Sequence, residues 1–250
     1  MEVATRRLVG RNALVTGAAK RIGRAVSLAL AREGANVALH YSSSKREIAE
    51  LAVEIEALGV KAVTLRADLS KPAELVGLIK RAHEALGKIE ILVNNASIFP
   101  SDTLETVEIE GLERNLKINA WAPLVLTRRL AAQTEHGHVV NLLDSRVSGF
   151  ARSHVSYILS KQVLAALTRL SALELAPGIA VNAVAPGLIL PPPGEGEEYL
   201  KRLATSLPLQ RRGTPEDVAA AVIYLVSSEF VTGETIYVDG GRRLNVKKGE

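Results

Sequence analysis

Short apolar runs alternate with longer amphipathic stretches along the whole chain, and this alternation restricts the fold more than any other feature. Seven runs are rich in Val, Ile and Leu with little polar alternation, which is typical of strands buried on both faces of a sheet. They are residues 12–17, 36–41, 61–68, 89–96, 137–144, 178–186 and 234–241. Between them, stretches such as 45–59 and 72–87 repeat apolar residues every three or four positions and end on glycine. This alternation predicts an α/β fold with a doubly wound parallel sheet.

The 250 residues contain no linker, low-complexity tract or second pattern of elements, which predicts one domain over residues 1–250. The longest irregular piece is 187–209. It is too long for a bare connection, so we expect a lid over a ligand there. No apolar run is long enough to cross a membrane, and no leader-like segment opens the chain. Together with the absence of cysteine, these features favour a cytoplasmic location and no membrane partner.

The charge pattern argues against two further classes of partner. The net charge is +4, but the basic residues are dispersed and aromatic residues make up only 4% of the chain, so we expect no nucleic-acid partner. The five histidines are scattered. His136 and His138 flank a glycine, but no third ligand lies near them in sequence, so no metal site is expected.

A glycine-containing turn follows the first predicted strand and opens a helix. Gly17 and Gly23 allow the chain to turn tightly, so that backbone N–H groups at the helix N-terminus can approach a pyrophosphate. The strict spacing of three glycines found in many dinucleotide sites is absent. The alternative is a helix start that needs glycine for its geometry alone.

The end of the second predicted strand indicates which nicotinamide cofactor would fit. An NAD site places an acidic residue there to bind the ribose hydroxyls, yet no acid occurs between Gly34 and Glu47. Instead His40 and serines 42–44 are followed by Lys45 and Arg46, with Lys20 in the glycine turn. Hydroxyl and cationic groups accept a 2′-phosphate, which favours NADPH over NADH. The alternative is an ordinary serine-rich turn before a helix.

Two polar residues at later strand ends fit the same cofactor. Asp68 ends the third predicted strand, where its carboxylate could accept a hydrogen bond from an adenine. Asn94 ends the fourth, beside the point where a doubly wound sheet reverses its order and ligands gather.

Tyr157 and Lys161 are four residues apart, which places both side chains on one face of a helix. A tyrosine has an ordinary pKa near 10, so acid–base work near pH 7 needs ~4 kcal/mol of bias toward the phenolate. The charge of Lys161 would supply part of that bias, and Asn119 could hold a water that links the lysine to solvent. Taken alone, a Tyr–Lys pair at this spacing is usually a surface pair.

The combined motifs resemble the short-chain dehydrogenase/reductase family over nearly the whole chain. The motifs are the glycine turn, Asn-Asn-Ala at 94–96, Asn119, Tyr157-x-x-x-Lys161 and Ala-Pro-Gly at 185–187. The resemblance implies a Rossmann fold with a seven-stranded parallel sheet, a homotetramer, and catalytic roles for Asn119, Tyr157 and Lys161. One departure stands out, because Asp144 occupies the position of the family's catalytic serine.

Other departures make the chain similar to the pteridine reductases within this family. Arg21 replaces the middle glycine of the turn, Phe99 follows Asn-Asn-Ala-Ser, and His-Tyr-Ser follows the second strand. This resemblance implies that a pterin lies between the nicotinamide and Phe99, while Ser97 and Arg21 contact the pterin or the cofactor phosphate.

These interpretations define the predicted site. Its catalytic residues are Asp144, Tyr157, Lys161 and Asn119. Its cofactor contacts are Gly17, Lys20, Arg21, Ile22, Gly23, His40, Tyr41, Ser42, Ser43, Ser44, Asp68, Leu69, Asn95, Ala96, Ser97, Tyr157, Lys161, Pro186 and Gly187. Its substrate contacts are Arg21, Ser97, Phe99, Asp144 and Tyr157.

The chemistry of Asp144 separates the possible substrates. A fixed carboxylate would repel the alkoxide formed by ketone reduction, whereas reduction of a pterin C=N bond leaves a ring nitrogen that needs a proton. An Asp with an ordinary pKa is only ~0.1% protonated at pH 7, so as a proton donor it requires burial that raises its pKa, or acidic conditions. If Asp144 is the proton donor, kcat/KM for a pterin should rise from pH 8 toward pH 5. The alternative is an acceptor that only orients Tyr157.

The sequence thus predicts NADPH-dependent reduction of a pterin such as dihydrofolate, biopterin or a related dihydropterin. One alternative is a ketone reductase of the same family, for example one that acts on 3-oxoacyl thioesters. A non-catalytic NADPH-binding protein is a third, although such a protein needs none of Asn119, Tyr157 and Lys161.

Overall fold

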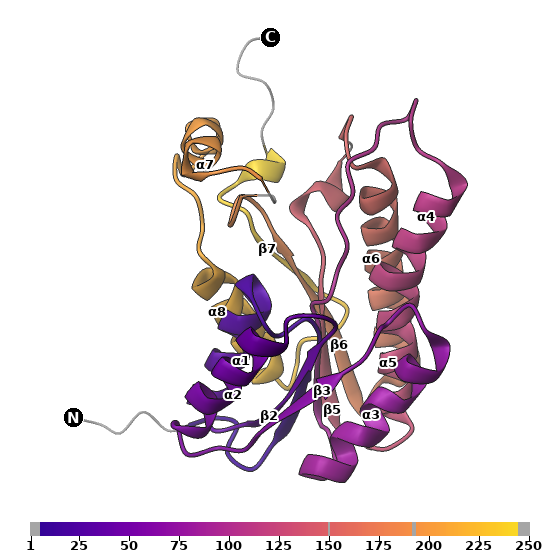
Figure 1. Ribbon diagram of the computed structural model, residues 1–250, viewed down its shortest axis with the longest axis vertical. Helices are drawn as coiled ribbons and strands as arrows, with labels where there is room; N and C mark the ends of the chain where they lie inside the picture. Colours follow the sequence, from indigo (N-terminus) through magenta and orange to yellow (C-terminus); the bar gives the residue numbers. More distant parts are fainter. Residues whose placement is uncertain (1–5, 150, 192–193, 245–250) are drawn as a thin grey trace, which may run out of the picture.

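The computed structural model describes residues 6–149, 151–191 and 194–244 (Figure 1). The strands are β1 (Asn12–Val15), β2 (Asn36–Tyr41), β3 (Ala62–Arg66), β4 (Ile91–Asn94), β5 (Gly137–Leu142), β6 (Ile179–Pro186) and β7 (Thr235–Val238). The α-helices are α1 (Arg21–Arg32), α2 (Lys45–Glu56), α3 (Pro72–Leu86), α4 (Ile109–Leu116), α5 (Ala122–Ala131), α6 (Val155–Leu175), α7 (Glu197–Ala204) and α8 (Pro215–Val226). Three short helical segments are η1 (Lys117–Trp121), η2 (Ser145–Ser148) and η3 (Arg242–Leu244).

The seven strands form one sheet in the order β3-β2-β1-β4-β5-β6-β7, and every neighbouring pair is parallel. The order reverses between β1 and β4, where Leu14 lies opposite Leu92. The predicted Rossmann fold with a seven-stranded parallel sheet is therefore confirmed. In such a sheet the loops after β1 and β4 diverge and leave a crevice at their carboxyl ends.

Helices cover both faces of the sheet, as Figure 1 shows, with α1, α2 and α8 on one side and α3, α4, α5 and α6 on the other. Alternate residues of one strand enter the two cores. Ala13 and Val15 of β1 pack in the core under α1 and α8, whereas Leu14 packs in the core under α3 and α5. Burial on both faces explains why the strands read as continuous apolar runs.

Most predicted strands extend too far at their carboxyl ends. The run 89–96 predicted a strand through Ala96, but β4 ends at Asn94. Beyond it the backbone N–H groups of Asn95 and Ala96 both donate to the Thr16 hydroxyl, at 2.9 and 3.0 Å. The predicted run continued past the ladder because the chain stays partly buried where it turns into the loop, with Asn95 and Ala96 half-buried.

The segment 187–209, predicted as a lid, contains one helix, α7, which stands apart from the two helix layers in Figure 1. Leu200 and Ala204 of α7 pack with Leu188 and Leu207 in a small separate core. Residues 192 and 193 lie outside the described part of the segment. Whether it acts as a lid stays a prediction.

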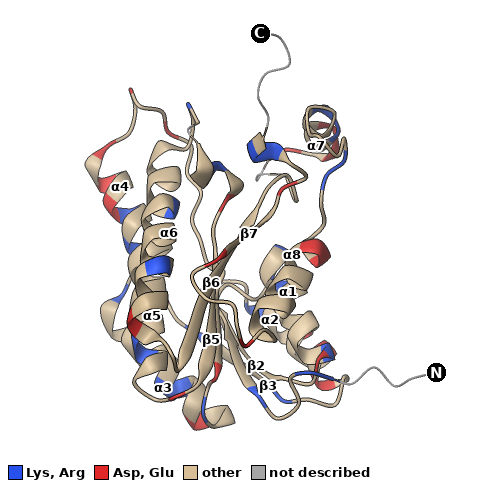
Figure 2. Cartoon of the chain, turned by 180° about the vertical axis from the view of Figure 1, so that it is seen from behind, with Lys and Arg blue, Asp and Glu red and all other residues tan. Residues whose placement is uncertain are grey.

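The described residues include no helix that is long and apolar enough to cross a membrane. Figure 2 shows Lys and Arg interspersed with Asp and Glu on helices of both layers. Within the same residues, no group of three or more His, Cys, Asp or Glu is arranged to hold a metal ion.

Truncation in the central strands should cost far more stability than truncation at the surface. Leu92 of β4 is fully buried, so we expect Leu92→Ala to lower the free energy of unfolding by roughly 2–5 kcal/mol. Leu104 is 83% exposed, and Leu104→Ala should change it by less than ~0.5 kcal/mol. Urea titration followed by circular dichroism measures both. Equal effects would contradict the assigned core.

Candidate active site

The glycine turn between β1 and α1 is closely packed against the loop after β4. Gly17 has φ +63°, and the Asn95 side chain donates to the carbonyls of Thr16 and Gly17 at 2.9 and 3.0 Å. A Cβ atom at Gly23 would overlap the carbonyl oxygen of Gly17. Lys20 at the N-cap of α1 gives the first turn no side-chain hydrogen bond, so the N–H groups at this end have no side-chain cap.

His40 does not contribute a ligand contact in the way that the sequence predicted. Its ring is buried and has both nitrogens occupied, because the Gly17 N–H donates to Nδ1 at 3.1 Å and Nε2 lies 3.0 Å from the carbonyl oxygen of Ala67. These partners fix the neutral ring with its proton on Nε2. Burial lowers the pKa of His40 to about 4. The side chain therefore joins β2, β3 and the glycine turn, and the predicted phosphate contact is corrected to this role.

The other predicted phosphate contacts stand at the surface beside the carboxyl end of β2. Ser42 and Ser43 are exposed, and Ser44 is half-buried at the start of α2. Lys20 reaches across from the glycine turn and forms an ion pair of 2.8 Å with Glu47. The site thus brings hydroxyl groups and one paired lysine to this edge, with Tyr41 half-buried next to them.

The ends of β3 and β4 differ in what their polar side chains contact. The Asp68 carboxylate accepts hydrogen bonds from the backbone N–H and the hydroxyl of Ser70, at 2.9 and 2.7 Å, which lower its pKa. Leu69 beside it is buried. Asn94, expected in the crevice, instead donates to Asn141 across the sheet at 2.8 Å. Its neighbour Asn95 is the residue that faces the glycine turn.

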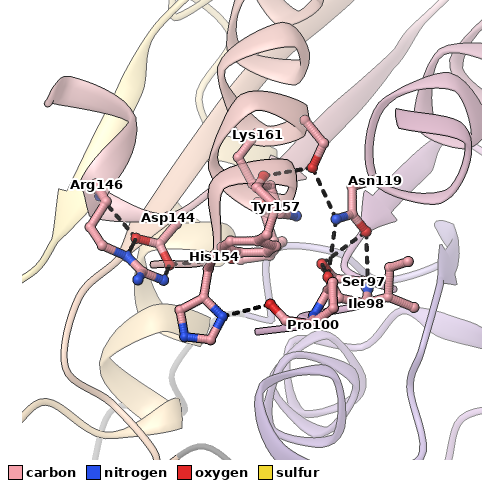
Figure 3. Close-up of polar contacts among 11 residues, drawn as sticks. Ser97, Ile98, Pro100, Asn119, Asp144, Arg146, His154, Tyr157 and Lys161 are labelled. Atoms are coloured by element: carbon pink, nitrogen blue, oxygen red, sulfur yellow. Dashed lines mark hydrogen bonds and ion pairs between the residues drawn. The ribbon is translucent and has the colours of Figure 1, made fainter. Parts of the chain in front are cut away.

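Asn119 lies in η1, a π-helical turn between α4 and α5. Its Oδ1 accepts from the Ser97 hydroxyl and the Ile98 N–H, both at 3.0 Å, and its Nδ2 lies 3.0 Å from the Ser160 hydroxyl oxygen (Figure 3). The side chain is fully buried. These direct contacts join the β4 loop to α6. The water link from Asn119 to Lys161 stays a prediction.

Asp144, Arg146 and Tyr157 form the centre of the site (Figure 3). The Tyr157 hydroxyl donates to Asp144 Oδ2 at 3.2 Å. Arg146 holds the same carboxylate with two parallel bonds, Nε to Oδ1 at 3.0 Å and Nη2 to Oδ2 at 2.9 Å, and its backbone N–H adds a third to Oδ1 at 2.9 Å. The predicted approach of Asp144 to the phenol is therefore present, together with a cation that the sequence analysis did not identify.

The charges in this cluster act against a protonated Asp144 and against an ionised Tyr157, the two states that acid–base roles near pH 7 would need. Burial raises the pKa of Asp144, but the hydrogen bonds and charge of Arg146 outweigh it and lower the pKa below its ordinary value. Burial and the neighbouring carboxylate raise the pKa of Tyr157 well above 10. The resting site thus pairs an ionised Asp144 with a protonated phenol, which favours the acceptor interpretation of Asp144.

Lys161 is fully buried one turn after Tyr157 on α6. Its Nζ donates to the Leu142 carbonyl at 2.7 Å and lies 5.7 Å from the centre of the Tyr157 ring. Burial lowers the pKa of Lys161 to about 8, although the charge of Asp144 acts in the opposite direction. The ammonium group therefore faces the end of β5, beside the phenol.

Phe99, predicted as a stacking platform, has neighbours on two sides. The His154 ring stacks on it at 3.9 Å between centroids, and the Tyr157 ring meets it edge-on at 4.6 Å. His154 is fixed by a hydrogen bond of 2.6 Å between its Nδ1 and the carbonyl oxygen of Pro100. The Arg146 guanidinium carbon also lies 5.3 Å from the Phe99 ring centre, and the residue as a whole is 36% exposed. Whether Phe99 serves as a stacking platform stays a prediction.

Arg21 connects the glycine turn to the segment 187–209. It has φ +56°, and its guanidinium donates to the Pro191 carbonyl at 2.9 Å. Ile22 follows it, half-buried, in the first turn of α1. Pro186 ends β6, and Gly187 leaves no room for a side chain because a Cβ would lie 2.6 Å from the Asp239 Cα. The start of this segment thus lies beside the glycine turn.

Three residues near Asp144, Tyr157 and Phe99 were missed in the sequence. Arg146 and His154 touch Phe99, and Asp102 accepts hydrogen bonds from the backbone N–H and hydroxyl of Ser156 at the start of α6. Arg146 lies only two residues from Asp144, a spacing that could have marked it as the partner of a carboxylate. No local signal identifies His154 or Asp102, whose partners lie more than fifty residues away.

Comparison with known proteins places this geometry among oxidoreductases. The family model described as enoyl-(acyl carrier protein) reductase matches residues 17–243. The 3-oxoacyl-[acyl-carrier-protein] reductase FabG of Staphylococcus aureus is 35% identical, over 92% of this chain and 97% of that protein. The crystal structure of FolM alternative dihydrofolate reductase 1 from Brucella suis with NADP has 35% identity and a TM-score of 0.93, over 96% of this chain and 98% of that one. A blue fluorescent protein from a metagenomic library, crystallised with NADPH, has 35% identity and a TM-score of 0.87, over 94% and 98%.

These matches span nearly the full length of both partners. The chain belongs to the short-chain dehydrogenase/reductase family. Within it, the resemblance to the pteridine reductases is supported by the FolM structure.

The buried His40 ring should make the fold sensitive to acid. Its pKa of about 4, below 6.5 in the unfolded chain, means that the unfolded state binds more protons between these values, so stability falls as the pH drops from 6.5 toward 4. The full difference corresponds to ~3 kcal/mol. Urea titrations at pH 7 and pH 4.5 measure how much of the free energy of unfolding is lost on acidification. This loss should be smaller for His40→Asn than for the unaltered protein, because asparagine keeps an acceptor for Gly17 but does not titrate. His136→Asn, at an exposed position, serves as the control and should lose as much as the unaltered protein.

Proposed function

We propose that the protein is an NADPH-dependent reductase of pterins, with dihydrofolate, biopterin or a related dihydropterin as substrate. The observation that carries the proposal is the ionised Asp144 held against the Tyr157 hydroxyl at 3.2 Å, with the partly exposed Phe99 ring edge-on to the same tyrosine. A flat heterocycle with N–H groups suits a site made of an aromatic face and an acceptor.

The residues of the crevice fit NADPH. The crowded Gly17–Gly23 turn leaves the N-terminal N–H groups of α1 without a side-chain cap, which suits a pyrophosphate. No carboxylate interrupts Ser42–Ser44, although Lys20 shares its charge with Glu47. The structures of FolM and of the blue fluorescent protein, which hold NADP and NADPH, support the same choice. Bound in this crevice, the cofactor would supply a hydride to the substrate.

Tyr157 is the proposed proton donor to the substrate. Addition of a hydride to a C=N bond leaves a nitrogen anion, which is a stronger base than a phenolate, so a phenol with a raised pKa still acts as the acid. The phenolate that remains would face two cations, since the Arg146 guanidinium carbon and Lys161 Nζ each lie 5.7 Å from the ring centre. Their positive charges offset the repulsion from Asp144.

Asp144 is proposed to act as an acceptor that orients the phenol and the substrate. Its charge disfavours a developing alkoxide next to Tyr157 but accepts hydrogen bonds from the amino and N–H groups of a pterin. With Tyr157 as proton donor and Asp144 as hydrogen-bond acceptor, the site would favour pterins over ketones.

A ketone reductase of the same family is the second candidate. The identity of 35% with the 3-oxoacyl-[acyl-carrier-protein] reductase FabG favours it, because the two chains match over almost their full length. The carboxylate at position 144 argues against it. The homotetramer and the cytoplasmic location that the family resemblance implies stay predictions.

Substrate preference and its dependence on Asp144 test the proposal together. NADPH oxidation should be faster, in kcat/KM, with dihydrofolate, dihydrobiopterin or dihydromonapterin than with an acetoacetyl thioester. Asp144→Ser and the isosteric Asp144→Asn should each lower kcat/KM for the dihydropterin by roughly 10- to 100-fold, because both remove the charge. Methotrexate should bind the NADPH complex tightly. Unchanged dihydropterin turnover in both variants would overturn the role of the carboxylate.

The pH profile should be governed by Lys161. Its pKa of about 8 means that the ammonium group is lost above that pH, so kcat/KM should fall by about tenfold per pH unit there. Below pH 7 the profile should be flat to about pH 5, because Asp144 stays ionised, and the rise expected from a protonated Asp144 should not appear. Steady-state rates at saturating NADPH from pH 5 to 10 measure this. A profile that rises steadily toward pH 5 would restore Asp144 as the donor.

A further inference from the structure

Arg146 contacts each of the three side chains that define the reacting end of the site. It binds Asp144 with two parallel hydrogen bonds, and its guanidinium carbon lies 5.3 Å from the Phe99 ring centre and 5.7 Å from the Tyr157 ring centre. Only 19% of its side chain and 16% of that of Asp144 are exposed. The pair is thus shielded from water, where a bidentate bond is strong and an unpaired charge is costly.

The backbone contributes to the same arrangement. Asp144 caps η2, and its Oδ1 accepts from the Arg146 N–H at 2.9 Å as well as from the guanidinium. This leaves Oδ2 for Arg146 Nη2 and the Tyr157 hydroxyl. The planar guanidinium therefore fixes the plane of the carboxylate and aims one oxygen at the phenol.

We propose that Arg146 is a positioning residue that keeps Asp144 as a fixed carboxylate aimed at the Tyr157 hydroxyl and thereby selects nitrogen heterocycles with N–H donors over ketones. The selection follows from charge, since a permanent acceptor attracts N–H donors and repels a developing alkoxide. The substrate class rests on the proposed function, whereas the effect of Arg146 on Asp144 does not.

The groups that face Asp144 allow Arg146 to be singled out. Tyr157 and Lys161 approach from α6 and Arg242 from η3, in addition to Arg146 on η2. Tyr157 is neutral, and Lys161 bonds to Leu142 rather than to the carboxylate. Of the two arginines, only Arg146 has hydrogen bonds to Asp144 among the described residues. Replacement of its side chain would leave the buried carboxylate with two neutral donors, the Tyr157 hydroxyl and the backbone N–H of residue 146, and without its bonded cation, which shifts it toward the protonated form.

The first measurement needs no substrate. A carbon-13 NMR titration of carboxyl-labelled aspartate follows Asp144, whose signal is identified by its absence in Asp144→Asn. Its midpoint should lie below that of ordinary aspartates in the unaltered protein and rise by about one pH unit or more in Arg146→Met. Arg146→Lys should fall between the two, because an ammonium group cannot form the bidentate bond. Arg169→Met, at an exposed position on α6, is the matched control and should leave the midpoint unchanged.

The second measurement concerns selectivity. The ratio of kcat/KM for dihydrobiopterin to that for an acetoacetyl thioester should fall by about tenfold in Arg146→Met. In the Asp144→Asn background the same substitution should change the ratio by less than about twofold, because Arg146 acts through Asp144. Arg146→Gln, which keeps a donor without the charge, replaces Arg146→Met if thermal unfolding shows that the latter does not fold.

The two measurements separate the inference from the proposed function. An unchanged Asp144 midpoint in the folded Arg146→Met or Arg146→Gln protein overturns the role of Arg146. The role of Arg146 is also overturned if Arg146→Met lowers the dihydrobiopterin-to-thioester ratio of kcat/KM by as much in the Asp144→Asn background as in the unaltered protein. If the midpoint rises but the unaltered protein reduces no dihydropterin, the proposed function fails while the control of Asp144 by Arg146 stands.

Discussion

The parallel register of the seven strands is the constraint on which the site depends. Because all strands run the same way, their carboxyl ends meet at one edge of the sheet, and the reversal between β1 and β4 opens a crevice there. Three hydrogen bonds hold the glycine turn beside that crevice. The Thr16 hydroxyl accepts from the N–H groups of Asn95 and Ala96, and the Gly17 N–H donates to the His40 ring. The glycine turn is therefore held by its neighbours on both sides, before any ligand contributes.

A second set of contacts fixes the helix that carries Tyr157 and Lys161. The π-helical turn turns Asn119 inward, where it joins the Ser97–Ile98 backbone to Ser160 of α6. Farther out, Asp102 caps the same helix through Ser156. Buried amides and hydroxyls that satisfy one another in this way resist displacement, because every break leaves an unpaired polar group. The Tyr157 phenol is thus positioned by the loop after β4, which also carries Phe99.

How far the sequence predicts this arrangement depends on the range of the interactions. Apolar periodicity located all seven strands, and β2 matches its predicted run of 36–41 throughout, because burial leaves a local pattern. The approach of Asp144 to Tyr157 followed from family resemblance. The protonation states of Asp144 and Tyr157 could not be predicted in this way, because they depend on which charges surround a buried group in space. His40 looked like a phosphate ligand for the same reason, as nothing in sequence shows that Gly17 and Ala67 occupy both ring nitrogens.

Under the proposed function, the position of the positive charges would account for a preference for pterins over ketones. A serine at position 144 would be neutral and could donate to an alkoxide, so Tyr157 and the serine would act together on a carbonyl oxygen. A buried aspartate without a cation would tend to take up a proton and behave much like that serine. Arg146 removes this option by holding the carboxylate ionised at 2.9 and 3.0 Å. Under the proposed function, a change from serine to aspartate would alter the chemistry of the site only in combination with the guanidinium of Arg146. The unit of specificity would then be the Asp144–Arg146 pair rather than the acidic residue alone.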